Sequence, residues 1–447
     1  MMQPDERPLR VALAGLGTVG AGVVRLIDEN GAILRQRAGR PIEIVAVSAR
    51  DRAKDRGVDI SRFRWTDDMG EFATAEDIDV VVELVGGADG PALTLARESL
   101  AAGKGFVTAN KAMIAHHGLD LAARAEAAGL ALKYEAAVAG GIPVIKGLRE
   151  GAAANRIVRV YGILNGTCNF ILSAMEADGR DFAAVLADAQ AKGFAEADPS
   201  FDIDGVDAAH KLSILASLSF GTRVDFAGVD VGGIRRIIAA DIAQARALGY
   251  RVRLIGLAEV DGSNGDARLF QRVAPVLVPL HHPLAAVEGA TNAVVMEGNF
   301  VGRLLFQGAG AGDGPTASAV VADLVDIARG EMGPAFSIPT AALAGPGRAE
   351  AGHRRAKYYL RMEVADKPGV LAEVATAMRD AGVSIDSLIQ TEAQDGEAED
   401  GSGGEERALI AMVTHRCEER CVTDTLAALA GSDSIVGVPM WMQLIDN

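Results

Sequence analysis

The chain has 447 residues, a length that predicts about three domains with well-developed cores. Lysine and arginine number 44 against 60 aspartate and glutamate residues, and the formal net charge of −16 disfavours nucleic acid and anionic membranes as partners. Three cysteines are too few for a disulfide framework and match no zinc-binding spacing. No run approaches the ~18 apolar residues of a membrane span, and the first ten residues lack a signal-type apolar stretch. We therefore expect a cytoplasmic protein.

Predicted strands and helices alternate over residues 1–140. Arg10 to Leu13 read as a short buried strand, GLGTVG follows, and apolar residues then recur at helical spacing. Further strands are predicted at Ile42 to Arg50, at Ile78 to Gly87, and within Lys104 to Met113 and Leu130 to Val144. Alternation of this kind implies a parallel sheet with right-handed crossovers. We expect residues 1–140 to form a Rossmann-type dinucleotide-binding domain.

From about Gly141 the pattern changes to that of an α+β domain, which we place at residues 141–314. A strand entering a helix is predicted over Val158 to Leu172, and a long helix over Gly205 to Gly221. Strand-like runs follow at Val252 to Val260, Ala267 to Pro279 and Ala290 to Gly310. A helix then begins near Pro315, and we expect residues 315–343 to complete the first domain.

Residues 344–357 are small, basic and rich in glycine, which indicates a linker. Residues 358–447 follow the order strand, helix, strand, strand, helix, strand, which is typical of a small ferredoxin-like unit. Within it, residues 392–407 contain acids and glycines without a large apolar residue, and we expect a disordered hairpin tip there.

The motif GLGTVG fits the G-x-G-x-x-G pattern between a strand and a helix, where backbone N–H groups can approach a pyrophosphate. Its predicted cofactor contacts are Gly15, Leu16, Gly17, Thr18, Val19 and Gly20. The second strand ends at Arg50, whose charge favours the 2′-phosphate of NADP. Asp51 follows and leaves NAD open. The alternatives are a tight turn without a ligand and a solvated arginine.

Four segments carry a resemblance to a known family: TANK, EAAVAGGIP, NGTCNF and FAEADPSFDIDGVDAAHKL. In this order they resemble homoserine dehydrogenase in the monofunctional form with a C-terminal ACT domain. The match runs over nearly the whole chain, and the acidic stretch near residue 400 is its obvious departure. The resemblance implies interconversion of L-homoserine and L-aspartate 4-semialdehyde with NAD(P)H, in threonine, methionine and isoleucine biosynthesis.

The predicted catalytic residues are Lys211, Asp207 and Lys111. Reduction of an aldehyde develops negative charge on oxygen, which calls for a nearby cation or proton donor. Asp207 and Lys211 are four residues apart on a predicted helix and therefore share a face. Lys211 is the expected proton donor, as the resemblance also implies. Lys111 follows the fourth predicted strand, where ligands collect, and could polarise the carbonyl or contact the nicotinamide. On spacing alone, the Asp207 and Lys211 pair could equally be a surface salt bridge.

The ammonium group of homoserine calls for carboxylates, and the candidates are Glu196 and Asp207, with Asp202 behind them. In the family, the position of Glu196 binds substrate and that of Asp207 assists the lysine. The segment NGTCNF borders the substrate pocket in the family, which makes Asn165, Gly166 and Thr167 candidate contacts. Alternatively Asn165 or Thr167 only caps a helix.

The segment EAAVAGGIP offers one carboxylate and a glycine-rich bend, which suit a hard monovalent cation. In the family a sodium ion is held by the side chain of Glu135 and by the carbonyls at Val138, Gly140 and Ile142. An ordinary glycine turn is the alternative. No transition-metal spacing is present in the sequence, and we expect no catalytic metal.

The segment DKPGVLAEVATAMRDAGVSI resembles the ACT signature, in which the turn before the first helix lines an amino-acid site. The implied effector is L-threonine, and the candidate contacts are Asp366, Pro368, Gly369, Val370 and Leu371. A dimerisation module without a ligand is the alternative. The resemblance also implies a catalytic and dimerisation role for the second domain and a homodimer or homotetramer. Two other functions stay open: a dehydrogenase of another amino-acid aldehyde, and a nucleotide-binding amino-acid sensor without turnover.

Overall fold

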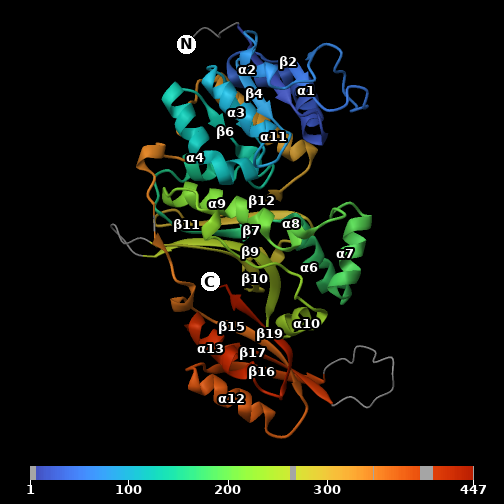
Figure 1. Ribbon diagram of the computed structural model, residues 1–447, viewed down its shortest axis with the longest axis vertical. Coiled ribbons are helices and arrows are strands. Elements are labelled where there is room, and N and C mark those ends of the chain that lie inside the picture. Colours follow the sequence, from blue (N-terminus) through green and yellow to red (C-terminus); the bar gives the residue numbers. More distant parts are fainter. Residues whose placement is uncertain (1–6, 262–267, 346, 393–405, 446–447) are drawn as a thin grey trace.

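The computed structural model describes residues 7–261, 268–345, 347–392 and 406–445. Figure 1 shows three parts along the long axis: a parallel sheet with its helices at the top, a broad sheet with helices in the middle, and a small α/β unit at the bottom. Most of the acidic stretch expected to be a hairpin tip lies outside the described residues.

The first sheet has the strand order β3-β2-β1-β4-β5-β6, and all its pairs are parallel. This is the order of a doubly wound dinucleotide-binding fold, which reverses direction next to β1. Its strands are β1 (Leu9–Ala14), β2 (Ile42–Ser48), β3 (Arg64–Trp65), β4 (Val80–Glu83), β5 (Gly105–Thr108) and β6 (Leu132–Lys133). The sequence did not predict β3, because two residues without an apolar run carry no strand pattern.

Helices cover both faces of this sheet: α1 (Thr18–Ala38), α2 (Glu71–Thr74), α3 (Pro91–Ala101), α4 (Lys111–Ala128) and α11 (Asp313–Ala328). Although α11 is distant in sequence, it packs against α1 and shares its apolar core with β1. The approach is close because Gly22 has no side chain, and a Cβ there would lie 3.2 Å from the Cβ of Ala317.

The middle sheet begins in the order β12-β11-β7-β9-β10, and these neighbours are antiparallel. Its strands are β7 (Ile157–Ile163), β9 (Tyr250–Asp261), β10 (Arg268–Pro279), β11 (Thr291–Gly298) and β12 (Gly302–Ala309), with the short β8 (Asp230–Val231) and β13 (Gly347–Arg348) each pairing with β10. The helices of this part are α6 (Gly166–Asp178), α7 (Phe182–Ala191), α8 (Ser200–Ile203), α9 (Val206–Phe220) and α10 (Ala239–Ala247). Helix α9 is buried along most of its length, because it packs on the sheet and also meets α4 of the first part.

The C-terminal unit has the sheet order β19-β15-β17-β16 with antiparallel neighbours, the ferredoxin-like arrangement. Its elements are β15 (Tyr358–Ala365), α12 (Val370–Asp380), β16 (Ile385–Glu392), β17 (Arg407–Thr414), β18 (Cys417–Glu418), α13 (Glu419–Leu429) and β19 (Ile435–Leu444).

The middle and C-terminal sheets are joined, because β19 pairs in parallel with β10 through Val276 with Gln443 and Leu277 with Leu444. The segment predicted as a linker takes part in two of the sheets. It contains β13 on the middle sheet and β14 (Arg355–Ala356), which pairs with β18.

Candidate active site

A cavity of about 810 Å³ lies between the first and middle parts. Its lining comes from the carboxyl end of the first sheet, from α6 and α9, and from the segment between β12 and α11. A cleft beyond the carboxyl ends of parallel strands is the usual place for ligands in such a fold. Several candidate residues line it together: Val19, Lys111, Gly140, Asn165, Gly166, Thr167, Asp202, Asp207 and Lys211.

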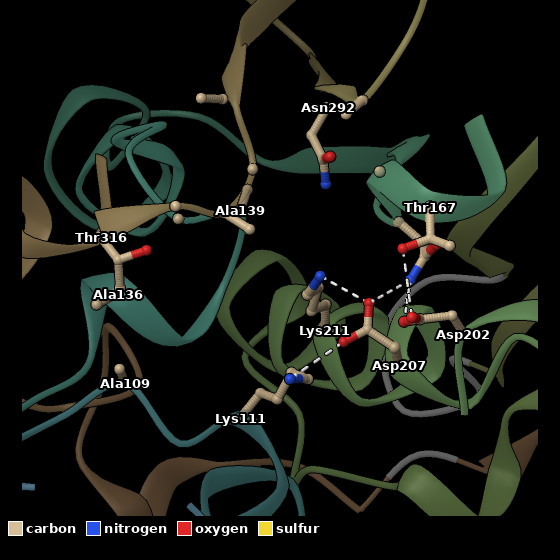
Figure 2. A pocket seen from close by; sticks show the side chains of 18 of the residues that line it. Ala109, Lys111, Ala136, Ala139, Thr167, Asp202, Asp207, Lys211, Asn292 and Thr316 are labelled. Atoms are coloured by element: carbon tan, nitrogen blue, oxygen red, sulfur yellow. Dashed lines mark hydrogen bonds and ion pairs between the residues drawn. The ribbon is translucent and has the colours of Figure 1, made fainter. Parts of the chain in front are cut away.

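Asp207 lies between two lysines (Figure 2). Its Oδ2 is 2.7 Å from Lys211 Nζ, one turn along α9, and its Oδ1 is 3.2 Å from Lys111 Nζ on α4. Burial alone would raise the pKa of Asp207, but the charges of Lys211 and Lys111 outweigh burial and hold the pKa well below its usual range. Asp207 is therefore an anion that holds two cations at the cavity wall.

Lys211 is fixed at a second point, because its Nζ also donates to the Leu164 carbonyl oxygen at 2.8 Å. Its side chain is 11% exposed and that of Lys111 is 31% exposed. Lys211 is thus the more buried of the two ammonium groups and is held at two points. Lys111 reaches the same carboxylate from α4 of the first part. Lys111 follows the fifth strand in chain order rather than the fourth, because β3 precedes it.

Asn165 connects the two acids of the site. Its Nδ2 donates to Asp202 Oδ1 and to Asp207 Oδ2, both at 2.8 Å, while its Oδ1 accepts the Cys168 N–H at the start of α6. Thr167 Oγ1 lies 3.3 Å from Asp202 Oδ2. Burial, followed by the charge of Asp207, raises the pKa of Asp202. Asn165 therefore both caps α6 and lines the cavity, two roles that the sequence left open as alternatives.

Glu196 lies apart from this group. It is exposed on the loop after α7 and is not among the residues that line the cavity. Gln190 Nε2 donates to its carbonyl oxygen at 3.0 Å, so the contact described for this residue is a backbone one. Substrate binding by Glu196 stays a prediction.

The glycine loop has the backbone geometry that its motif predicts. Gly15 has a φ of 105°, and a Cβ at Gly20 would lie 2.2 Å from the Gly15 carbonyl oxygen. Gly17 precedes α1 as its N-cap and supplies no side-chain acceptor, so the first N–H groups of α1 are available to a phosphate. Val19, in the first turn of α1, lines the cavity.

Arg50 is exposed beyond the end of β2. Nearby, Arg56 Nε donates to the Leu16 carbonyl oxygen of the glycine loop at 2.9 Å, and its guanidinium lies 5.8 Å from the Trp65 ring. The sequence did not point to Arg56, because it lies in a loop eight residues beyond the end of β2.

Three further residues of the site were missed. Glu83 at the end of β4 is fully buried, and its carboxylate accepts the Val85 and Gly86 N–H groups and the Thr108 hydroxyl, which braces the segment before Lys111. The signal for Glu83 in the sequence was an acidic residue at the end of a predicted buried strand. Asn292 and Thr316 line the cavity from β11 and α11 (Figure 2) and belong to no motif.

The segment proposed to hold a cation is also buried. The carboxylate of Glu135 accepts the Ile145 and Lys146 N–H groups, each at 2.9 Å. The backbone bends at Ala139 and Gly140, which have φ values of 58° and 53°. Burial, with Asp323 adding its charge, raises the pKa of Glu135 to about 8. A buried acid whose charge is so poorly compensated fits a bound cation, which would favour its ionised form.

A second group of carboxylates, from Glu150, Asp326 and Glu331, has ligand atoms within 4.8 Å of one another. Lys146 already pairs with Asp326, so a positive charge is present there without a metal.

The turn predicted to bind an effector lies on the surface of the C-terminal unit. Asp366, Pro368 and Gly369 are exposed, Leu371 is 42% exposed, and Val370 is buried. Gly369 is the N-cap of α12 with a φ of 100° and supplies no side-chain acceptor, so the first N–H groups of the helix are available.

Cys168, Cys417 and Cys421 are free thiols. Among the described residues, no helix combines the length and the apolar composition needed to cross a membrane.

Family models match most of the chain. The model described as homoserine dehydrogenase, NAD binding domain matches residues 15–135, the model described as homoserine dehydrogenase matches residues 143–325, and an ACT domain model matches residues 358–419.

Curated relatives span the whole length. The chain is 44% identical to a homoserine dehydrogenase of Pseudomonas aeruginosa, over 96% of this chain and 97% of the relative. It is also 44% identical to one of Mycobacterium tuberculosis, over 99% of both chains.

Solved structures agree with these matches. A crystal structure of a homoserine dehydrogenase from Thiobacillus denitrificans has a TM-score of 0.89 at 40% identity, covering 99% of both chains. A hyperthermophilic archaeal homoserine dehydrogenase in complex with NADPH has a TM-score of 0.60 at 25% identity, covering 72% of this chain and 97% of that chain.

Proposed function

This chain belongs to the homoserine dehydrogenase family, and from that premise we propose that it interconverts L-homoserine and L-aspartate 4-semialdehyde with NADP as the preferred coenzyme. The observation that supports this reaction best is the pair of lysines held by one buried carboxylate in the cavity. In the reductive direction the aldehyde and NADPH take up one proton, and homoserine and NADP⁺ leave.

When bound, NADPH supplies the hydride, and the side chains of this chain handle the proton and the charge. We assign Lys211 as the donor of the proton to the developing alkoxide, because it is the more buried and doubly anchored ammonium group. Asp207 pairs with both lysines and holds them at the cavity wall. Lys111 polarises the carbonyl oxygen or faces the nicotinamide. In the oxidative direction Lys211 receives the hydroxyl proton.

The substrate has a charged ammonium and a carboxylate, and each needs partners in the cavity. Asp202 and Asp207 are the carboxylates that line the cavity together with Lys211, and we assign the ammonium to them, with Glu196 on the neighbouring loop. Asn165, Gly166 and Thr167 line the same wall at the start of α6, where free N–H groups favour a carboxylate.

The choice of NADP rests on Arg50, which follows β2 and whose cationic side chain suits a 2′-phosphate. A related archaeal protein was solved with NADPH, which supports the same coenzyme here. We also propose a monovalent cation such as sodium at Glu135, Val138, Gly140 and Ile142. The raised pKa of the buried Glu135 supports a cation there.

The ACT unit is the proposed regulatory part. We propose that L-threonine, an end product of the pathway, binds at the turn from Asp366 to Leu371 and inhibits the enzyme. We further propose that the protein is a homodimer or homotetramer. We place it in the cytoplasm, because its three free thiols favour a reducing compartment.

The proposal is tested by following absorbance at the nicotinamide band with L-homoserine and either NADP⁺ or NAD⁺, alongside other hydroxy amino acids. We expect turnover with homoserine to exceed that with the other substrates, and turnover with NADP⁺ to exceed that with NAD⁺. Arg50→Ala should then raise the KM for NADP⁺ and leave the KM for NAD⁺ unchanged, so that the preference for NADP⁺ over NAD⁺ becomes smaller. Equal turnover with serine or with another hydroxy acid would reject the substrate assignment.

A further inference from the structure

A cluster of aromatic rings lies behind Lys111, where α4 of the first part meets α9 of the middle part. His116 comes from α4, one and a half turns after Lys111, and His210 comes from α9, next to Lys211. Their Nε2 atoms are 3.2 Å apart, within hydrogen-bond distance. This hydrogen bond therefore joins the two helices that carry the two lysines of the site.

The rings around this bond are closely packed. Phe226 stacks on His210 at 4.2 Å between centroids with 4° between the planes, and it meets His116 edge-on at 4.9 Å. On the other side, Phe201 lies 5.7 Å from His210, and the Nζ of Lys111 lies 5.5 Å from the Phe201 ring. The packing thus continues from the histidine pair to the ammonium group of Lys111.

His210 is 4% exposed. The charged groups that act on it are Lys111 from α4 and Asp207 from its own helix. Burial, then His116 and Lys111, lower the pKa of His210 to about 4. His210 is consequently neutral at pH 7, and its Nε2 can accept the N–H of His116.

Lys111 needs such support more than Lys211 does. Lys111 forms an ion pair with Asp207 at 3.2 Å, and its side chain is about one third exposed. A lysine carries four flexible bonds, and a displacement of 1 Å at a reacting group can reduce a rate by about a hundredfold.

We propose that His116 and His210 form a positioning pair whose hydrogen bond, made across the boundary between α4 and α9, holds Lys111 in place beside Asp207. The inference rests on the proposed reaction, because it assigns the pair to the geometry of that site. Neither histidine lines the cavity, so both act through Lys111.

The test compares three variants of α4. His116→Phe keeps a ring against Phe226 but removes the N–H donor, whereas His116→Gln keeps an N–H donor at similar reach. His117→Asn is the matched control, because His117 is the next residue on the helix and pairs with the exposed Asp89. For each variant we measure kcat, the KM for homoserine, the Kd for NADPH and the Tm.

We expect His116→Phe to lower kcat by about tenfold, with the KM for homoserine changed less than about threefold. His116→Gln should restore most of the rate, and His117→Asn should match wild type. The Kd for NADPH should stay at its wild-type value in all three, and the Tm should fall only slightly in His116→Phe, where one buried hydrogen bond is lost. A wild-type kcat in His116→Phe would overturn the proposal, as would a His116→Gln variant no better than His116→Phe. So would a rate loss accompanied by a lower Tm and weaker NADPH binding.

A double-mutant cycle tests the pair itself. If His116 and His210 act through their mutual bond, His210→Leu combined with His116→Phe should lose no more activity than the worse single variant. Additive losses would contradict the pair. The outcome differs from failure of the proposed reaction, in which the wild type itself would fail to oxidise homoserine.

Discussion

Asp207 is the single residue on which the charge balance of the site depends. Two lysines from different domains would repel each other at the same cavity wall without this anion. We expect Asp207→Asn to lower kcat by about a hundredfold, because the two ammonium groups lose their common negative charge and one of their two acceptor oxygens. Steady-state kinetics with homoserine and NADP⁺ measure this loss.

The matched control is Asp204→Asn, three residues earlier in the same segment. Asp204 pairs with Arg235 on the surface and does not line the cavity, so its loss should leave kcat near the wild-type value. Equal losses of kcat in the two variants would show that any substitution in this segment disturbs the site, and that Asp207 has no particular role.

Glu135 leads to a prediction about ions. Because burial and Asp323 raise the pKa of Glu135 to about 8, its ionised form is poorly stabilised by the protein alone. If a cation binds there, sodium chloride should raise the Tm at pH 8 more than the same concentration of tetramethylammonium chloride does. Differential scanning calorimetry measures the difference, and Glu135→Gln should abolish it. An equal response to both salts would argue against the cation site.

The sequence pointed to those cavity residues that lie in recognisable segments, and their roles stay predictions. Lys111, Asn165, Asp202, Asp207 and Lys211 do line one cavity. Asn292 and Thr316 line it too, but they come from β11 and α11, which contribute to the cavity only after the chain has folded back. No local pattern marks such residues. Glu196 also belongs to a recognisable segment, but it lies on an exposed loop and does not line the cavity, so its binding of substrate stays a prediction.

At the scale of elements, the turn from β1 into α1 depends on the absence of a side chain at Gly20. A methyl group there would lie 2.2 Å from the Gly15 carbonyl oxygen, so the glycine loop would have to open. We expect Gly20→Ala to weaken NADPH binding by at least about tenfold, because the N–H groups that face the pyrophosphate would be displaced. Fluorescence titration with NADPH measures this change.

Gly31→Ala serves as the control on the same helix. It has open space around its Cβ position, so alanine should be tolerated and should stabilise α1 by about 0.5–1 kcal/mol. If both substitutions weakened NADPH binding equally, the effect would not arise from the loop.

Most long elements were predictable, because their hydrophobic periods extend over many residues. The long helices α1, α9 and α11 and the strands β9 to β12 lie where the apolar patterns place them. The two-residue strands β3, β13 and β14 were not predicted, because pairing with a neighbour defines them and their own side chains do not. Both β13 and β14 lie in the expected linker, where they pair with β10 and β18.

At the scale of the whole molecule, the C-terminal unit is anchored to the middle part by buried ion pairs as well as by β10 and β19. Arg272 on β10 makes two hydrogen bonds with the Glu419 carboxylate on α13, at 2.6 and 2.8 Å. Arg361 on β15 donates from its Nε to Asp241 Oδ1 on α10, at 2.7 Å. Their low exposure makes these pairs sensitive to the loss of one partner.

We expect Glu419→Gln to destabilise the docked C-terminal unit by about 3 kcal/mol, because Arg272 would stay buried with its charge only partly matched. Calorimetry should show a lower Tm or a separate early transition. Asp386→Asn is the control, because it removes a half-exposed pair with Lys357 and should change the Tm little. An unchanged Tm in Glu419→Gln would contradict the anchoring role.

The joined sheet was beyond sequence reasoning. Each unit could be predicted from its own pattern, but the parallel pairing of β10 with β19 depends on which strand edges stay open after both units fold. The sequence has no signal for the pairing of β10 with β19. The order of the three parts along the chain, in contrast, followed from their patterns of apolar residues.

The most direct test of the account is the rate of homoserine-dependent NADPH formation in wild type, Lys211→Ala and Lys357→Ala. Lys357 lies just before β15, does not line the cavity, and controls for the loss of a lysine. The account predicts turnover in wild type and in Lys357→Ala, and a loss of at least about a hundredfold in Lys211→Ala with NADPH binding retained. A Lys211→Ala variant with most of the wild-type rate, or a wild type that binds NADPH without oxidising homoserine, would contradict it.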